Sequence, residues 1–295
     1  MLRISFAVCL LSVLNARSCI SEDRALVLCI DESYQCSVLA TSAAGFAAPD
    51  EAVWHDDRAY LADEAGNSVV SWSPTEGLHR LASRRNGLKS PEDLVIADDG
   101  TVFFTDDDAG GLWQVSPAGD VSQLAEKSQG LVSTEGLALA PDGSLLVGDG
   151  TAHKVFRVTR SGDVSVFLDD TAGITKPESL VYDPEGNLYI ADNEQNIVYS
   201  VDGDLRVRKL IDEADGIHPE SICYHQGALF ITDDEAGKLY SFVPGERPRA
   251  VLLFAGSLKN LQGIAEGPDG SLLVTVQDLE LKTGYLLQVT QLRPK

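Results

Sequence analysis

The stretch KPESLVYDPEGNLYIAD, residues 176–192, holds a glutamate, an apolar run, a tight turn, a second apolar run and a final aspartate. Five related stretches stand at 49–63, 91–106, 134–149, 219–233 and 261–276. The acidic or amide residue near the start of each copy is, in chain order, Asp50, Glu92, Glu135, Glu178, Glu220 and Gln262. A period of roughly 42 residues with four strands in each repeat is typical of propeller blades. Six copies therefore predict an all-β fold, a six-bladed β-propeller.

One repeat, residues 135–170, shows the expected blade. Apolar runs at 137–140, 145–148, 154–158 and 164–168 predict four strands, and Pro-Asp-Gly at 141–143 and Ser-Gly-Asp at 161–163 predict tight turns between them. The third strand of the last repeat, 284–290, is followed by only a few residues. The run from Tyr34 to Ala40 is therefore predicted to supply its fourth strand and close the ring. A further strand is expected at 25–30, in a place that the sequence does not fix.

Recurring residues in the third strand of each blade are expected to pack between blades. They are Trp113, Phe156, Tyr199, Tyr240 and Leu286.

Charge and composition restrict the possible partners. The chain has 295 residues and a formal net charge of −22, which argues against nucleic acid as a partner, because phosphate binding needs a basic surface. The sequence after residue 18 holds no stretch apolar enough to span a membrane. We expect a monomer with a small-molecule substrate.

The N-terminus resembles a secretory signal. Arg3 precedes a short apolar run, and small residues precede Cys19. We predict a signal peptide at 1–18, a single domain at 19–295, and a secreted or periplasmic protein; a lipid-modified Cys19 is the alternative. Cys29 and Cys36 are expected to form a disulfide or to be two buried side chains. Cys223 is expected in the core.

The direction of the strands places the acidic residues on one face. Each opens the innermost strand of its blade, so Asp50, Glu92, Glu135, Glu178 and Glu220, with Gln262, should surround the mouth of the central channel. Like charges this close shift their pKa values or bind a cation. Hard oxygen ligands favour a divalent cation, most often Ca²⁺. The alternative is that backbone N–H groups of neighbouring blades satisfy these carboxylates and the ring is structural.

A second acidic tier ends the second strand of five repeats: Asp63, Asp106, Asp149, Asp192 and Asp233. A carboxylate that follows a strand often caps the next turn. We expect a structural role for this tier.

Candidate proton-transfer groups lie on the same face. His153 follows Asp149 and His218 precedes Glu220, and histidine titrates near neutral pH. Glu178, His218 and His153 are the candidate catalytic residues; a solvated loop histidine is the alternative for the last two.

At these residues the chain, over about 34–290, resembles the senescence marker protein/gluconolactonase/luciferin-regenerating enzyme family of six-bladed propellers. DEAVW at 50–54 is similar to the family's blade-one motif. The resemblance implies a divalent metal, often Ca²⁺, held by the residues that open the inner strands, and hydrolysis of a lactone or related ester. The chain departs from the family in having no Asn at these positions.

Two other resemblances support rival functions. YIADNEQNIVYSV at 189–201 resembles NHL repeats, which often only bind partners, and FTDDDAGGLWQV at 104–115 resembles the streptogramin lyase propellers. The sequence predicts an exported, metal-dependent, gluconolactonase-like hydrolase. The alternatives are a non-catalytic propeller that binds a partner or ligand on its acidic face, and a metal-dependent lyase.

Overall fold

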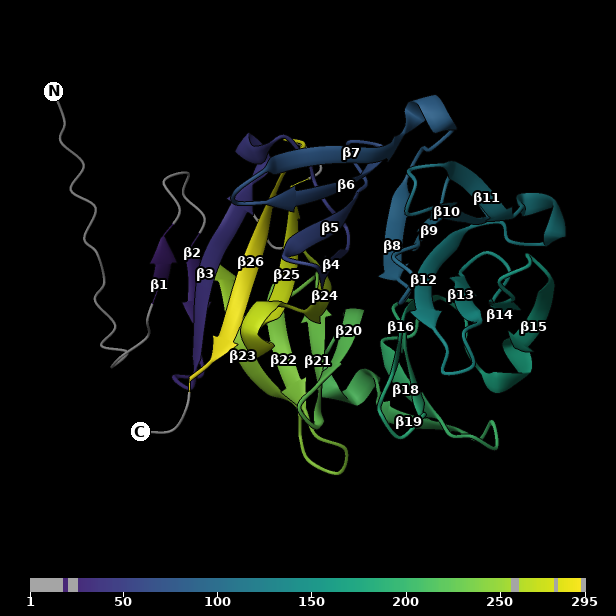
Figure 1. The fold of residues 1–295 in the computed structure, drawn as a ribbon. Coiled ribbons are helices and arrows are strands. Elements are labelled where there is room, and N and C mark those ends of the chain that lie inside the picture. Colours follow the sequence, from purple (N-terminus) through teal and green to yellow (C-terminus); the bar gives the residue numbers. More distant parts are fainter. Residues whose placement is uncertain (1–17, 21–25, 256–259, 279–280, 293–295) are drawn as a thin grey trace, which may run out of the picture.

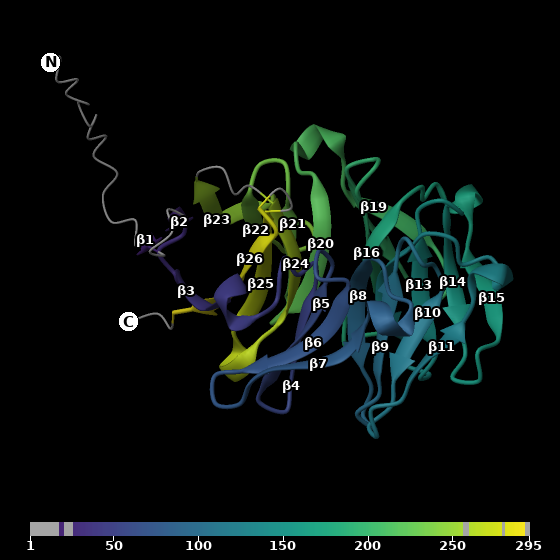
Figure 2. The same cartoon turned by 90° about the horizontal axis from the view of Figure 1, so that it is seen from above.

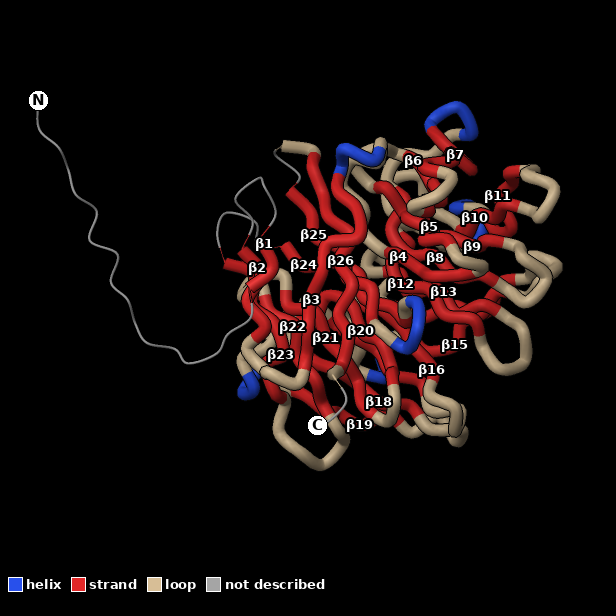
Figure 3. The backbone as a smooth tube through the Cα atoms, turned by 60° about the vertical axis from the view of Figure 1, so that its left-hand side comes forward, coloured by secondary structure: helices blue, strands red, loops and turns tan. Residues whose placement is uncertain are grey.

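A computed structural model describes residues 18–20, 26–255, 260–278 and 281–292. Six antiparallel sheets follow one another around a ring (Figure 1), and the helical segments among the described residues are short 3₁₀ turns (Figure 3). The six-bladed propeller predicted from the repeat is confirmed. Among the described residues, no helix is long and apolar enough to cross a membrane.

Each of the first four blades is a four-stranded sheet whose strands follow one another in chain order. Blade one holds β4 (Ala52–His55), β5 (Arg58–Asp63), β6 (Ser68–Ser73) and β7 (Gly77–Ser83). Blade two holds β8 (Pro91–Ile96), β9 (Val102–Asp106), β10 (Leu112–Val115) and β11 (Val121–Ala125). Blade three holds β12 (Thr134–Leu139), β13 (Leu145–Asp149), β14 (Lys154–Val158) and β15 (Val164–Leu168). Blade four holds β16 (Pro177–Tyr182), β17 (Leu188–Asp192), β18 (Ile197–Val201) and β19 (Val207–Ile211).

The last two blades include strands from the N-terminal part of the chain. Blade five holds β20 (Pro219–His225), β21 (Ala228–Asp233), β22 (Lys238–Phe242) and β23 (Arg249–Ala255). Its outer edge is extended by β2 (Leu26–Cys29) and then β1 (Ser18–Ile20), which lie beside β23 in Figure 2. Blade six holds β24 (Asn260–Glu266), β25 (Leu272–Asp278), β26 (Thr283–Gln291) and β3 (Tyr34–Thr41).

The ring closes as the sequence predicted. Strand β3 pairs antiparallel with β26, in a register that runs from Tyr285 opposite Thr41 to Gln291 opposite Tyr34. The strand expected at 25–30 is β2, on the edge of blade five. Pairing with β3 covers the edge of β26, which would otherwise present free backbone groups to other chains.

The core lies between the blades, in clusters that each join two adjacent sheets. Trp113 packs with blade-one residues, Phe156 with blade-two residues and Leu286 with blade-one residues, while Tyr199 packs on blade three and Tyr240 on blade four. The predicted packing role of these third-strand residues is confirmed. Cys29 and Cys36 are buried in the cluster between blades five and six, and Cys223 is buried in the same cluster; a disulfide between the first two stays a prediction.

Five 3₁₀ turns repeat the same crossing from blade to blade. They are η1 (Ser42–Ala44), η2 (Arg84–Asn86), η3 (Lys127–Gln129), η4 (Asp170–Ala172) and η5 (Glu213–Asp215). Each ends at a glycine with a left-handed backbone, for example Gly130 at φ 105°, a conformation that other residues rarely adopt. A further turn, η6 (Pro268–Gly270), joins β24 to β25. Each crossing turn leads the chain back to the channel, where the next inner strand begins.

Candidate functional site: an acidic ring at the central channel

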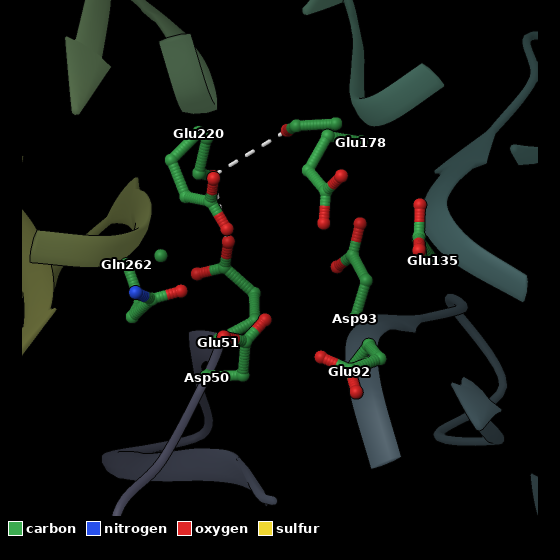
Figure 4. Close-up of a pocket in the computed structure, with 11 residues that line it drawn as sticks. Asp50, Glu51, Glu92, Asp93, Glu135, Glu178, Glu220 and Gln262 are labelled. Atoms are coloured by element: carbon green, nitrogen blue, oxygen red, sulfur yellow. Dashed lines mark hydrogen bonds between the residues drawn. The ribbon is translucent and has the colours of Figure 1, made fainter. Parts of the chain in front are cut away.

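Acidic side chains from all but the last blade meet where the inner strands begin. We call Asp50, Glu92, Glu135, Glu178, Glu220 and Gln262 the acidic ring; all six line one cavity at the centre of the propeller. Figure 4 shows side chains from different blades pointing toward the middle of this cavity. The five carboxylates predicted from the repeat are thus brought together, with Gln262 as the sixth member.

A second set of residues, which the repeat did not reveal, lines the same cavity. They directly follow the ring residues, and we call Glu51, Asp93, Ser179, Ser221 and Gly263 the inner layer. In five blades the register of the inner strand shifts at this point, for example between Thr134 and Leu137. A β-bulge places two adjacent residues on the same side of the strand. Simple alternation predicts only one channel-facing residue of each pair, so in blade two it does not predict that Asp93 faces the channel beside Glu92. Glu51, which follows Asp50 in blade one, was not predicted to face the channel either.

The inner layer fastens the blades to one another. Asp93 accepts hydrogen bonds from the backbone N–H of Leu94 (2.6 Å) and from that of Leu137 in the next blade (2.7 Å). Ser179 Oγ likewise accepts from Ile222 N–H in the next blade (3.2 Å). The structural alternative considered for the acidic ring therefore describes this layer instead.

Glu51 is the other inner-layer carboxylate, and it is equally well satisfied. It accepts from Ala52 N–H (2.8 Å), from Ser221 Oγ (2.9 Å) and from Ile264 N–H (3.3 Å). Glu51 and Asp93 are thus structural by their bonding, whatever their charge.

The acidic ring is bonded differently: within the described residues, the groups that donate hydrogen bonds to its carboxylates are side chains. Ser90 Oγ donates to Glu92 (3.0 Å), and Gln277 Nε2 donates to Asp50 (3.2 Å). Gln262, with its amide oriented to suit its neighbours, donates to Asp50 Oδ1 (2.9 Å) and Glu220 Oε1 (3.1 Å). Side-chain donors can move, so these carboxylates are available to a ligand in a way that the inner layer is not.

Lys176 supplies a positive charge to one side of the ring. Its Nζ lies 2.7 Å from Glu178 Oε2 and 3.6 Å from Glu135 Oε1. Gly150 makes room for it, because a Cβ at that position would lie 2.9 Å from Lys176 Cγ and 3.0 Å from Glu135 Oε2. The Oε2 atom of Glu135 is buried and has no hydrogen-bond partner among the described residues.

The other side of the ring gains a further carboxylate, Glu64. One oxygen each from Asp50, Glu64 and Glu92 lie within 4.8 Å of one another. Ser90 Oγ reaches Glu64 Oε1 (3.3 Å) and Gln277 Nε2 reaches Glu64 Oε2 (3.1 Å). Glu64 follows the outer aspartate Asp63 in sequence, and the same position in other blades holds Asp107, Gly150, Asn193, Asp234 and Gln277. Reading the residue after each outer aspartate would have found this tier.

Burial and mutual repulsion shift the ring's pKa values upward. Burial, then Glu178, raises the pKa of Glu135 to about 9. Burial, then Glu92 and Glu220, holds the pKa of Asp50 well above its usual range. Burial lowers the pKa of Lys176, but Glu178 and Glu135 outweigh it, so the net shift is upward and Lys176 stays charged. The raised pKa values mean that burial and like charges disfavour ionisation of these carboxyl groups, and groups with shifted pKa values often cluster at functional sites.

The ring's geometry suits a single cation. The cavity has room for about 10 Å³ of water-sized volume, close to one water-sized sphere. Its walls are hard oxygen donors of the kind that bind Ca²⁺, and the buried Oε2 of Glu135 has no hydrogen-bond partner among the described residues. A small-molecule substrate is larger than this cavity and would have to bind at its mouth.

Beyond the inner layer the channel widens and becomes apolar. A cavity of about 280 Å³ is lined there by Glu51, Asp93 and apolar residues from all six blades, among them Leu137 and Ile222. The inner layer therefore separates an acidic end of the channel from an apolar end.

The outer aspartates have the structural role that was expected. Asp149 accepts from the N–H groups of Val132 (2.6 Å), Ser133 (3.2 Å) and Ala152 (2.8 Å), so it joins the incoming loop to the turn after its own strand. Asp106 repeats this pattern, and Asp192 and Asp233 also bind both loops. Asp63 accepts from Ala47 N–H (2.8 Å). All five are buried.

The two candidate histidines lie away from the cavity. Nδ1 of His153, which is exposed, lies 2.7 Å from the carbonyl oxygen of Thr175. Nε2 of His218 lies 3.4 Å from Glu235 Oε2. Neither is among the residues that line the cavity, so of the three predicted catalytic residues only Glu178 lies at the ring.

Comparisons with known proteins support the fold. No family model matches the sequence, and neither does any curated protein. Among solved structures, the chain is similar to a gluconolactonase from Xanthomonas campestris (TM-score 0.67, 14% identity, 90% of each chain). It is also similar to the calcium-binding protein regucalcin from Agrobacterium tumefaciens (TM-score 0.64, 18% identity, 84% of this chain and 92% of that one). Virginiamycin B lyase from Staphylococcus aureus matches comparably (TM-score 0.66, 13% identity, 87% and 99%). At these identities the likeness establishes the fold, and it agrees with the resemblances noted in the sequence.

Proposed function

We propose that this protein is an exported, metal-dependent hydrolase that acts on a small lactone or a similar ester. The observation that carries the proposal is the bonding of the acidic ring. Its carboxylates face one ion-sized cavity. Over the described ranges of the chain, their hydrogen-bond donors are side chains, whereas backbone N–H groups hold the inner layer. The signal peptide at 1–18, on which export rests, falls almost entirely outside the described residues.

The ring residues fit a divalent cation, with Ca²⁺ as the first candidate. A bound cation would polarise the substrate carbonyl and stabilise the charge that develops on its oxygen. Asp50 and Glu92, with their side-chain donors Gln277 and Ser90, would hold the cation. Ionising several buried carboxylates is unfavourable in the metal-free protein, but with a cation bound the same negative charges would attract it.

Glu135 is the best-placed proton acceptor in the ring. Its buried Oε2 has no partner among the described residues and would take a proton from the attacking water as the new C–O bond forms. The ester C–O bond then breaks, and the leaving oxygen takes the proton back from Glu135. Without a bound cation, burial and Glu178 raise the pKa of Glu135 to about 9, so its side chain is protonated at neutral pH. The positive charge of a bound cation, added to that of Lys176 beside Glu135 and Glu178, would favour the ionised form that accepts the proton.

The test combines metal content with turnover. Metal in the purified protein is measured by mass spectrometry, Ca²⁺ affinity by calorimetry, and hydrolysis with a panel of lactones and esters. We expect EDTA to abolish hydrolysis and Ca²⁺ to restore it. Glu92→Gln should weaken Ca²⁺ binding, and Glu135→Gln should lower kcat by roughly 100-fold or more with Ca²⁺ affinity largely kept. Glu194→Gln, at an exposed position of blade four, is the control.

Two results would redirect the proposal. Ca²⁺ binding without hydrolysis of any lactone or ester would favour the non-catalytic alternative, a propeller that binds a partner on its acidic face. Elimination products in place of hydrolysis products would favour the lyase. The lyase has less support, because His153 and His218 lie away from the cavity. A protein that neither contains nor binds metal contradicts the hydrolase.

A further inference from the structure

We propose that the channel is built for two positive charges, a divalent cation held off the axis by Asp50, Glu64 and Glu92 and the ammonium group of Lys176 held opposite by Glu135 and Glu178. The proposal rests on the proposed function for the presence of the cation. It goes further in assigning the ion to one side of the ring, in adding Glu64 as a ligand, and in giving Lys176 the place of a second ion.

The side that contains Glu64 has the arrangement of a cation site. Asp50, Glu64 and Glu92 bring three oxygens within 4.8 Å of one another from three separate segments of blades one and two. Gln277 donates to Asp50 and Glu64 and comes from blade six. The uncharged donors orient the carboxylates without neutralising them.

The nearest lysine in sequence does not neutralise this side. Lys89 stands three residues before Glu92, but its Nζ lies 3.5 Å from the carbonyl oxygen of Asp108 and its side chain is exposed. The three carboxylates are therefore left with hydroxyl and amide partners, although burial and like charges raise the pKa values of all three.

The opposite side already holds a cation, the Lys176 ammonium. It contacts Glu178 at 2.7 Å and Glu135 at 3.6 Å. In blade three the residue after the outer aspartate is Gly150, and a Cβ there would lie 2.9 Å from Lys176 Cγ, so any side chain at this position would require Lys176 to move. In this part of the ring, Gly150 stands where blade one has the proposed ligand Glu64, and the ammonium group of Lys176 supplies the positive charge that a second metal ion would otherwise provide.

The unpartnered oxygen shows what this half of the ring would do without its lysine. The Glu135 side chain lines the cavity and is 9% exposed, and its Oε2 has no hydrogen-bond partner among the described residues. Removing Lys176 would leave the Glu135 and Glu178 carboxylates without a positive partner in the part of the chain that the structure describes. We therefore expect a second divalent cation to enter there.

The arrangement also narrows the class of substrate. A substrate at the mouth would have its carbonyl oxygen near the cation and another part of the molecule near Lys176, whose side chain is 34% exposed. An ammonium has three N–H donors, and at most two are used by Glu135 and Glu178. The third favours a lactone or ester that carries a further hydrogen-bond acceptor, such as a hydroxyl or carboxylate.

Calorimetric titration with Ca²⁺ tests the assignment without relying on activity. The wild-type chain should bind one equivalent. Glu64→Gln should weaken binding by at least 10-fold, whereas Glu178→Gln should change it by less than about threefold. Lys176→Met should bind two equivalents, and the control Lys89→Met should bind one. If Lys176→Met does not fold, as judged by thermal melting, Gly150→Ala replaces it, because the added methyl would displace Lys176 and should likewise admit a second ion.

The outcomes separate this inference from the function on which it rests. Undiminished binding by Glu64→Gln together with loss of binding by Glu178→Gln would place the ion on the Lys176 side, so the inference would fail while the metal-dependent hydrolase stands. One equivalent bound by both Lys176→Met and Gly150→Ala would overturn the role of Lys176. No Ca²⁺ binding by the wild type would overturn both proposals.

Discussion

Glu92 and Asp93 are adjacent in one strand and line one cavity, yet their surroundings assign them opposite roles. Asp93 accepts from two backbone N–H groups, one of them in the next blade, so its carboxylate is part of the scaffold. Among the residues that the structure describes, Glu92 accepts only from the hydroxyl of Ser90. Burying a carboxylate with so few donors is costly, and burial and nearby charge raise its pKa well above the usual range. The acidic ring is therefore a destabilised element that a cation would relieve.

The stability of the metal-free protein should fall as the pH rises. The pKa of Glu135 is raised from 4.5 to about 9, so between these values the folded chain holds a proton that the unfolded chain has lost. Unfolding then releases a proton, and the free energy of unfolding decreases with pH. For a chain of this size a change of 1 kcal/mol corresponds to about 2–4 °C. In EDTA we expect the melting temperature to fall by roughly 5 °C or more between about pH 5 and about pH 9.

A variant and a ligand check the origin of this slope. Glu135→Gln cannot ionise and should reduce the slope of the profile, while the other ring carboxylates with raised pKa values keep part of it. Saturating Ca²⁺ should raise the melting temperature most at the alkaline end, where the ring is charged. A profile in EDTA that rises with pH and is unaffected by Glu135→Gln would contradict the shift assigned to Glu135.

How much of this site could be read from the sequence depended on periodicity. The ring residues recur at a fixed spacing, so their meeting at the axis followed from the repeat. Asp93 could not be predicted because a bulge breaks the two-residue alternation of its strand. Glu64 was not predicted because the residue type at the equivalent position differs from blade to blade. The contact of Lys176 with Glu135 joins two blades, and a single repeat cannot reveal it.

At the scale of an element, the loops that bring the chain to the channel depend on the outer aspartates. Asp149 and its counterparts each accept from the loop before the inner strand or from the turn after the second strand, and most accept from both. The carboxylate thus fixes where the inner strand begins, and with it the place of the ring residue. The outer aspartates therefore recur with the same spacing as the ring residues, although their role is structural.

Asp149→Ala should destabilise the fold substantially. It leaves the N–H groups of Val132, Ser133 and Ala152 without their acceptor, and each buried unsatisfied group costs about 1–3 kcal/mol. We expect a loss of roughly 3–5 kcal/mol in chemical denaturation after some relaxation of the loops. Asp149→Asn keeps one acceptor oxygen and should lose less. Asp170→Ala, at an exposed position, is the control; equal losses in Asp149→Ala and Asp170→Ala would show that the hydrogen bonds of Asp149 contribute little.

At the scale of the whole molecule, one strand from the N-terminal part of the chain, β3, pairs with β26 of the last repeat and closes the ring of six blades. Strand β3 covers β26 and places Tyr34 and Cys36 in the cluster between blades five and six. Strand β2, by contrast, lies on the outer edge of blade five. The acidic ring needs all the blades in place, because Gln262 and Gln277 of blade six orient the carboxylate of Asp50. Closure of the ring of blades and formation of the acidic site are therefore coupled.

Two truncated chains distinguish the effect of closing the ring of blades with β3 from the effect of shortening the N-terminus. A chain that starts at residue 32 lacks β1 and β2 but keeps β3, and it should fold with a moderately lower melting temperature. A chain that starts at residue 42 also lacks β3, which exposes the edge of β26 and the buried side chains of Leu286 and Val289. An open edge beside apolar side chains promotes aggregation, so we expect this chain to be insoluble or to melt at least roughly 15 °C lower, with a loss of several kcal/mol from the apolar side chains alone. Because the missing piece is a single strand, a synthetic peptide of residues 33–42 added in trans should restore solubility and Ca²⁺ binding together. Equal melting temperatures for the chains that start at residues 32 and 42 would show that pairing with β3 does not stabilise the ring of blades. The contacts between β24 and β4 would then have to keep blade six beside blade one.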